Sequence, residues 1–418
     1  MELLRQHDSE GPHPLMSSSP IAAIAGPRPT GTTSPTAVTD CERQGLLAAL
    51  AVVADPRDPR GIRYPLASML ATAVCAVMAG ACTFAAMADW VRDLDPPAWV
   101  KLGFTGKLPV PSTLWRLLTR VDDTELSVVV TRWVRARTAS VPVSGRRWRR
   151  VIAIDGKVLR GAKLPDGRQV HLLSAFDTST GTVLAYVQIA VKSNEIPAFT
   201  PLLDLVAAQL GSLEAIVFVA DALHAQTAHA REVASRGAYL MVAVKANQPT
   251  VFAQLKSLPW AQVPVGDRRT DTGHGRRETR TVKAVTVATP GGLGFPHAEQ
   301  AVRITRTRTV KGKTTREMAY LTVSLPAEDA QPVDLGAWAR SEWHIENRLH
   351  WVLDVTFRED AHQARTGTGP AVASVLRHAA INYHRSNGEA NIARATRRAN
   401  RRSNDLIDAV TSSYTTTQ

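Results

Sequence analysis

The chain has 418 residues, which is long for one ordinary domain, so two or three compact units are expected. Hydrophobic residues make up 44% and charged residues 21%, a balance that supports a sizeable core and excludes a globally disordered chain. The net charge of +13, from 50 basic and 37 acidic residues, favours a polyanionic partner, most often nucleic acid. Three cysteines are too few for a disulfide framework and fit a reducing, intracellular location.

The sequence gives little support for a membrane or secreted protein. Its start lacks the basic and then apolar pattern of a secretory signal. Residues 66–88 are uncharged over the length of a membrane span, but they are rich in alanine, which contributes little to insertion. We therefore expect a buried helix here, no membrane partner, and a cytoplasmic protein.

The N-terminal part divides into a leader and a helical region. Residues 1–41 are rich in Ser, Pro, Thr and Gly and predict a disordered leader. Apolar residues at helical spacing over 42–145 predict helices, one of them long at 66–88 and another capped by Ser112 or Thr113. A DNA-binding module is one interpretation of this region, because tryptophan and arginine share a face of the latter helix. An ordinary solvated face is the other interpretation.

Strand patterns begin after residue 150. Three come first, at 151–156, 171–177 and 182–191. A helix, a strand, a helix and a strand then follow at 198–210, 215–221, 225–236 and 238–245. The fourth strand is apolar throughout, which predicts burial on both faces of a sheet. This order indicates an α/β fold of the ribonuclease-H-like class, with a mixed sheet and helices on both sides.

The remaining chain predicts an insertion and closing helices. β-type runs separated by Gly and Pro signals indicate a β-rich insertion over 248–335. Helical patterns and a basic polar tail follow at 335–355, 371–385 and 391–418. We therefore expect a catalytic domain built from 146–247 and 336–390.

Three acidic residues stand where open sheets place their active sites. Asp155 and Asp221 each follow an apolar strand, and capping a turn is the alternative role for each. Glu346 lies on or beside the apolar face of its predicted helix, which costs free energy unless it pairs with Arg340 or Arg348 or binds a metal. Three hard oxygen ligands suit Mg²⁺ or Mn²⁺, and two such ions would support phosphoryl transfer without a nucleophilic side chain.

Several longer motifs together point to a known family. They include AIDGKVLRGA, HLLSAFD, NEIPAF, VADALHAQ, VKANQP and a long run beginning WHIENRLHWVLDV, at 153–162, 171–177, 194–199, 219–226, 244–249 and 343–355. With these motifs, residues 42–390 resemble the DDE transposases of bacterial insertion sequences, in the group related to the H-repeat-associated proteins. The resemblance implies that Asp155, Asp221 and Glu346 are the catalytic residues and the ligands of two Mg²⁺ or Mn²⁺ ions.

The resemblance also implies a reaction and a partner. The protein would cleave double-stranded DNA at transposon ends and join the 3′ ends to a target, as a homodimer acting on two ends. Basic residues near the predicted site are candidate DNA contacts: Lys157, Arg160, His224, Arg276, Arg277, Arg340 and Arg348. Each could instead have an ordinary surface, capping or salt-bridging role. A structure-specific nuclease on the same fold and a non-catalytic DNA-binding protein derived from a transposase are the alternative functions.

One position departs from the family pattern. Members of the group usually carry a histidine or another basic residue where this chain has Glu342. Glu342 precedes Glu346 by four residues, so the two carboxylates share a helix face and repel each other. We expect this pair to weaken metal binding.

Overall fold

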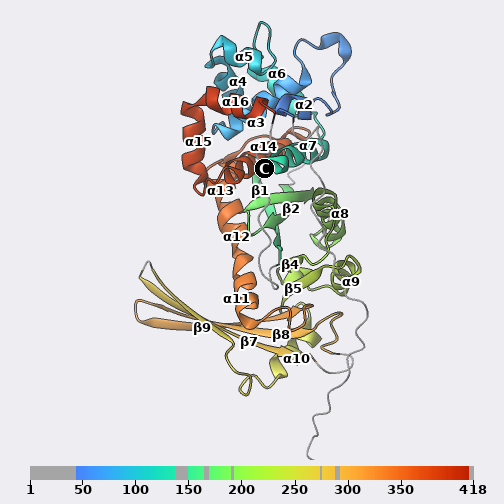
Figure 1. Cartoon of the computed structure of the whole chain (residues 1–418), viewed down its shortest axis with the longest axis vertical. Coiled ribbons are helices and arrows are strands. Elements are labelled where there is room, and N and C mark those ends of the chain that lie inside the picture. Colours follow the sequence, from blue (N-terminus) through green and yellow to red (C-terminus); the bar gives the residue numbers. More distant parts are fainter. Residues whose placement is uncertain are drawn as a thin grey trace, which may run out of the picture. The chain divides into compact units, whose positions relative to one another are not determined.

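The computed structural model describes residues 44–137, 149–163, 169–189, 193–273, 275–287 and 292–413, all within one compact unit, Pro35–Gln418 (Figure 1). The predicted leader and the last residues of the predicted tail lie outside these ranges. In the described part of the chain, no helix is long and apolar enough to cross a membrane.

Helices form the N-terminal region as predicted. They are α2 (Leu46–Leu50), α3 (Leu66–Met78), α4 (Phe84–Arg92), α5 (Pro96–Lys101), α6 (Pro111–Leu118) and α7 (Asp123–Ala136), with a short 3-10 turn η1 (Pro59–Gly61). The single helix predicted over 66–88 is wrong, because Gly80 adopts a left-handed φ of 98° and Thr83 caps a new helix. The predicted caps of α6 are also wrong, because Pro111 takes the first helical position, where its missing N–H costs nothing.

The sheet confirms the ribonuclease-H-like fold predicted from the sequence. Its first strands are β1 (Val151–Lys163), β2 (Gln169–Asp177), β3 (Thr182–Gln188), β4 (Val217–Ala220) and β5 (Tyr239–Val244). They lie in the order β3-β2-β1-β4-β5, in which β1 pairs antiparallel with β2 but parallel with β4, and β4 pairs parallel with β5. The sheet therefore has three antiparallel strands, β1 to β3, followed by β4 and β5 parallel to β1, as the order of elements in the chain predicted.

The β-rich insertion extends this sheet instead of forming a separate one. After α10 (Pro249–Ser257) it supplies β6 (Asp267–Gly273), β7 (Arg276–Thr286), β8 (Gln300–Val310) and β9 (Lys313–Val323). β9 pairs antiparallel with β5, and the sheet ends in the order β9-β8-β7-β6. The backbone hydrogen bonds of the central sheet thus continue directly into the insertion.

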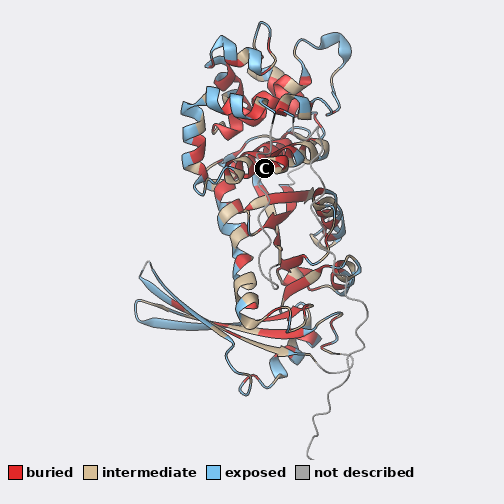
Figure 2. Ribbon diagram, viewed as in Figure 1, coloured by how far each residue is buried: buried red, intermediate tan, exposed pale blue. Residues whose placement is uncertain are grey.

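Helices cover both faces of the sheet, and Figure 2 shows its central strands buried. On one face lie α8 (Phe199–Leu210) and α9 (Thr227–Ser235), preceded by the 3-10 turns η2 (Ile196–Ala198) and η3 (Ala222–His224). On the other run α11 (Pro332–Ser341), α12 (Trp343–Ile345), the π-helical turn η4 (Glu346–His350) and α13 (Trp351–Val355), followed by the short turn η5 (Glu359–Ala361). Alternate β1 residues accordingly enter different cores, Ile152 and Ile154 on one side and Val151 on the other.

The C-terminal helices return to the N-terminal ones. α14 (Gly369–Ser386) contacts α3 and α7, and α15 (Ile392–Arg401) contacts α3. α16 (Ser403–Thr411) contacts α2 and α5. Most of the segment predicted as a polar tail is thus folded, because the few apolar residues of α15 and α16 lie on one face of each helix and are buried: Ile392, Ala395, Leu406, Ile407 and Val410.

One buried ion pair ties η5 to α14. Arg377 Nη1 donates to Glu359 Oε1 at 3.1 Å, and the two side chains are 4% and 1% exposed. A buried charge whose partner is removed is strongly destabilising, whereas removing both charges costs much less.

We therefore expect Arg377→Leu to lower the free energy of unfolding by about 3–5 kcal/mol. Adding Glu359→Gln to that variant should restore a large part of the loss, because no unpaired charge then stays buried. Urea unfolding followed by circular dichroism measures both effects. A single variant as stable as the parent would show that the pair is not buried in solution.

Candidate active site

Asp155 and Asp221 occupy matching positions on two neighbouring strands. The last paired residues of the parallel β1–β4 ladder are Ile154 and Ala220, and each aspartate directly follows its member of that pair. β1 itself continues past Asp155 to Lys163, paired only with β2. The strand end predicted at residue 156 is therefore wrong, because only the pairing with β4 stops near it, at Ile154. The end of that pairing brings both carboxylates to one edge of the sheet.

Backbone N–H groups hold one oxygen of each aspartate. Gly156 N–H donates to Asp155 Oδ1, and Leu223 N–H donates to Asp221 Oδ1, both at 2.9 Å. The second bond makes Asp221 the cap of η3, so the capping role considered from the sequence is real for this residue. A cap of this kind leaves the second oxygen, Oδ2, available, so it does not exclude a ligand role.

Glu346 begins the π-helical turn η4. The N–H of Trp351 bonds to the carbonyl of Glu346, five residues back, which defines the wider turn. Such turns are rare and concentrate at functional sites. Within this turn His350 lies beside Glu346, with its Nδ1 3.1 Å from Glu346 Oε2 and 3.5 Å from Asp155 Oδ2.

Asp155, Glu346 and His350 form a group that could hold a metal ion. One ligand atom from each lies within 4.8 Å of the others. His350 is 5% exposed and was not predicted from the sequence, although its place four residues after Glu346 puts it on the same helix face. Two carboxylates and one imidazole suit a divalent cation such as Mn²⁺ or Mg²⁺, the former accepting nitrogen more readily.

The acidic residues of this site repel one another. Burial raises the pKa of Asp155 to about 6; His350 opposes the shift, and the charges of Glu195 and Asp221 add to it. Burial also raises the pKa of Glu342 to about 7, with contributions from Asp221 and Asp155. The negative charges of both aspartates therefore disfavour the ionised form of Glu342. By contrast, the hydrogen bond from His350 holds the pKa of Glu346 below its ordinary value.

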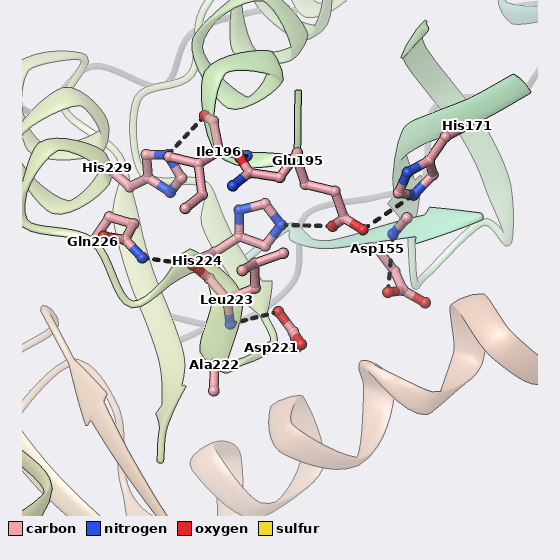
Figure 3. A network of polar contacts seen from close by, with 12 residues as sticks. Asp155, His171, Glu195, Ile196, Asp221, Ala222, Leu223, His224, Gln226 and His229 are labelled. Atoms are coloured by element: carbon pink, nitrogen blue, oxygen red, sulfur yellow. Dashed lines mark hydrogen bonds and ion pairs between the residues drawn. The ribbon is translucent and has the colours of Figure 1, made fainter. Parts of the chain in front are cut away.

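An acidic residue that the sequence interpretation missed, Glu195, lies near the aspartates. Glu195 accepts hydrogen bonds from His171 Nε2 at 3.1 Å and from His224 Nε2 at 3.3 Å (Figure 3). Burial raises its pKa, but the two histidine bonds outweigh that effect and lower it to about 2. Its only signal in the sequence was its place in the NEIPAF motif, where it was not distinguished from its neighbours.

The candidate DNA contacts fall into two groups, and four of them are engaged within the protein. Lys157 Nζ lies 2.8 Å from both carboxylate oxygens of Asp354, and Arg340 pairs with Asp271. Arg348 donates to the carbonyl of Thr178 at 3.2 Å. His224 bonds to Glu195. Because its side chain is only 1% exposed, we do not propose it as a DNA contact.

The other three candidates are exposed. Arg160 keeps 78% of its side chain exposed, with Asp360 3.9 Å away. Arg276 and Arg277 lie at the exposed end of β7. Being consecutive strand residues, they point to opposite faces of the sheet, so a single duplex surface would meet only one of them directly.

Comparison with known proteins identifies two family models along the chain. The model described as "Transposase DDE domain" matches residues 147–383, and a model for the region associated with that domain matches residues 47–134. The first match covers more than half of the chain and spans both aspartates and Glu346. It confirms the resemblance to DDE transposases found in the sequence.

Individual proteins agree with the family match. "Putative transposase YncI" of Escherichia coli O157:H7 is 28% identical over 359 residues, covering 82% of this chain and 87% of the relative. "H repeat-associated putative transposase YhhI" of Escherichia coli strain K12 is 26% identical, covering 82% of this chain and 90% of the relative. Among solved structures, a piggyBac transposase synaptic complex with hairpin DNA matches with a TM-score of 0.40 and 10% identity, over 89% of this chain and 78% of that one. That TM-score is too low to support an argument.

Glu342 and Glu346 should have opposite effects on the stability of the metal-free protein, because their pKa values are shifted in opposite directions. The pKa of Glu342 lies above its unfolded value of 4.5, at about 7, so the folded state binds more protons in that window and loses stability as pH rises through it. Glu342→Gln should therefore stabilise the metal-free protein at pH 8, by on the order of 2 kcal/mol. Glu346→Gln, the matched control one turn along, should not stabilise it, because the depressed pKa of Glu346 contributes stability at that pH.

Chemical unfolding of the parent and both variants in a chelator at pH 8 measures these effects. Equal stability of the parent and Glu342→Gln would mean that Glu342 points to solvent, away from the aspartates.

Proposed function

The chain belongs to the transposase DDE domain family, and from that premise we propose that it cleaves DNA at transposon ends and joins the freed 3′ ends to target DNA. The observation that supports this most directly is the β1–β4 register, which ends where Asp155 and Asp221 begin. Phosphoryl transfer of this kind requires positioning and charge stabilisation and no nucleophilic side chain.

We propose Asp155, Asp221 and Glu346 as the catalytic residues and as the ligands of two Mg²⁺ or Mn²⁺ ions. The fit is supported by the close grouping of Asp155, Glu346 and His350. It is also supported by the raised pKa of Asp155, because burial and the nearby charges of Glu195 and Asp221 disfavour its ionised form, which a cation would stabilise. When bound, such ions lower the pKa of a water or 3′ hydroxyl and offset the charge of the phosphodiester.

The chain's own groups orient these ligands. The backbone bonds from Gly156 and Leu223 fix one oxygen of each aspartate and leave Oδ2 of each available for a cation. The hydrogen bond with His350 selects one position of the otherwise exposed Glu346 side chain. Ligands held in this way lose little further conformational freedom when a cation binds.

We propose duplex DNA as the partner, bound by a homodimer that brings two ends together. Besides Arg160, Arg276 and Arg277, the folded helix α15 and the residue that follows it present exposed arginines: Arg394, Arg397, Arg398, Arg401 and Arg402. Arg394 and Arg398 bond to Glu389, which fixes their side chains along the helix. Arginines on a rigid helix are suited to bind phosphates.

Asp155→Asn, Asp221→Asn and Glu346→Gln should each abolish cleavage of a labelled transposon-end duplex in Mg²⁺, while DNA binding stays close to that of the parent. The reason is that ligand carboxylates stabilise the transition state, whereas phosphate contacts supply affinity. Asp204→Asn on α8 affects a surface ion pair with Arg236; it is the matched control and should cleave normally. A variant that cleaves at the parental rate would show that its residue is misassigned. A parent that cleaves without joining ends would favour the nuclease alternative, and one that binds without cleaving would favour the non-catalytic one.

Binding should also weaken steeply with salt, because neutralised phosphates release counterions. Replacing Arg397 and Arg401 by Gln should lower the slope of log affinity against log salt by about 1 for each lost phosphate contact. Arg236→Gln removes one positive charge from an internally paired site and serves as the control, in which the slope should not change. An unchanged slope in the double variant would exclude α15 from the DNA surface.

A further inference from the structure

Glu195 is a mostly buried carboxylate for which the proposed reaction has no use. Its side chain is 15% exposed, and each of its oxygens accepts a bond from a different histidine. His171 lies on β2, and His224 closes η3 (Figure 3). A single carboxylate therefore connects two segments that are distant in the sequence.

These two segments are the immediate supports of the aspartates. His171 lies opposite Val158 in the β1–β2 pairing, three residues after Asp155. His224 belongs to the turn that Asp221 caps, and its N–H bonds to the carbonyl of Asp221 at 3.2 Å. Figure 3 shows Asp155 and Asp221 on the same side of the cluster formed by Glu195 and the histidines.

The contacts of Glu195 with His171 and His224, here called the Glu195 bridge, lie where the sheet no longer connects the two segments. The β1–β4 hydrogen bonds end at the Ile154–Ala220 pair, so no ladder bond fixes the distance between the residues that follow. The contacts of Glu195 with His171 and His224 span this gap. They replace the missing ladder with two charge-assisted hydrogen bonds, which are stronger than neutral ones.

Gly156 makes room for the bridge. A Cβ built at this position would lie 2.1 Å from Glu195 Oε1 and 2.8 Å from His171 Nε2. Gly156 is not among the glycines with a left-handed φ, so space and not backbone conformation explains the glycine. The residue directly after Asp155 is therefore shaped to admit Glu195.

Buried rings fix the orientation of His224. Its ring lies 5.3 Å from that of Phe199, and His229 stacks on Phe199 at 3.9 Å. His229 Nε2 lies 3.1 Å from the carbonyl of Ile196, the residue after Glu195. The acceptor and one of its donors are thus held by the same small core.

We infer that Glu195 is a positioning residue, which holds Asp155 and Asp221 at the separation required to share divalent cations by bridging His171 and His224. The inference rests on the proposed function, because it assigns the support of that same site. Outer groups that orient ligands typically account for 10- to 100-fold in metal affinity.

Mn²⁺ binding to the DNA-free protein, measured by calorimetry, tests the inference without any cleavage assay. Glu195→Gln and Glu195→Asp should each weaken Mn²⁺ binding by about 10-fold or more. The aspartate keeps the charge but is one methylene shorter and cannot reach both histidines. Gly156→Ala should have the same effect by displacing Glu195. Glu232→Gln on α9 alters a surface ion pair with Arg236 and should bind Mn²⁺ as tightly as the parent does.

The outcomes separate the competing explanations. Parental affinity in Glu195→Asp together with weak binding in Glu195→Gln would overturn the bridge and leave only the charge. Parental affinity in all three variants would overturn any role. If a buried variant does not fold, His171→Phe, at a 28% exposed position, removes one donor and should still weaken binding. If instead Asp155→Asn and Asp221→Asn leave Mn²⁺ binding unchanged, the proposed metal site fails, whatever Glu195 does.

Discussion

The parallel register of β1 with β4 is the constraint on which the site depends. Four consecutive residue pairs, from Val151–Val217 to Ile154–Ala220, align two strands whose paired residues are 66 positions apart in the sequence. In each strand the next residue is an aspartate, Asp155 or Asp221. A shift of one residue would turn one of these side chains to the other face of the sheet. The apolar residues of the two strands prevent such a shift, because they are buried in cores on both sides.

The site combines carboxylates that repel one another with hydrogen bonds that hold their side chains in place. Asp155, Asp221 and Glu342 share a partly buried region. Burial and the charge of Asp221 raise the pKa of Asp155, and burial and both aspartates raise the pKa of Glu342, while His350 and the histidines around Glu195 supply fixed hydrogen bonds. An arrangement of this kind is costly in the protein alone and becomes favourable when a cation offsets the charge. The π-helical turn contributes by bringing His350 beside Glu346, within reach of Asp155.

The sequence predicted the fold, and the place of Asp155 and Asp221 at strand ends, better than the contacts around these residues. Apolar runs and turn signals determine strand order, so the mixed sheet and both aspartates were recognised from local patterns. The junction of β9 with β5 was not, because pairing between distant strands leaves no local signal. Glu195 and His350 were missed for the same reason: their roles come from side chains brought together only by the fold. The broken helix at Gly80 shows that a single left-handed residue can end an otherwise continuous apolar pattern.

The most direct test of this metal site is the position of bound Mn²⁺ in crystals of the protein, located by anomalous diffraction. We expect strong anomalous peaks at the edge of the sheet, within ligand distance of Asp155, Asp221 and Glu346. Crystals in which these three residues bind no Mn²⁺, or in which Mn²⁺ binds only elsewhere, would contradict it.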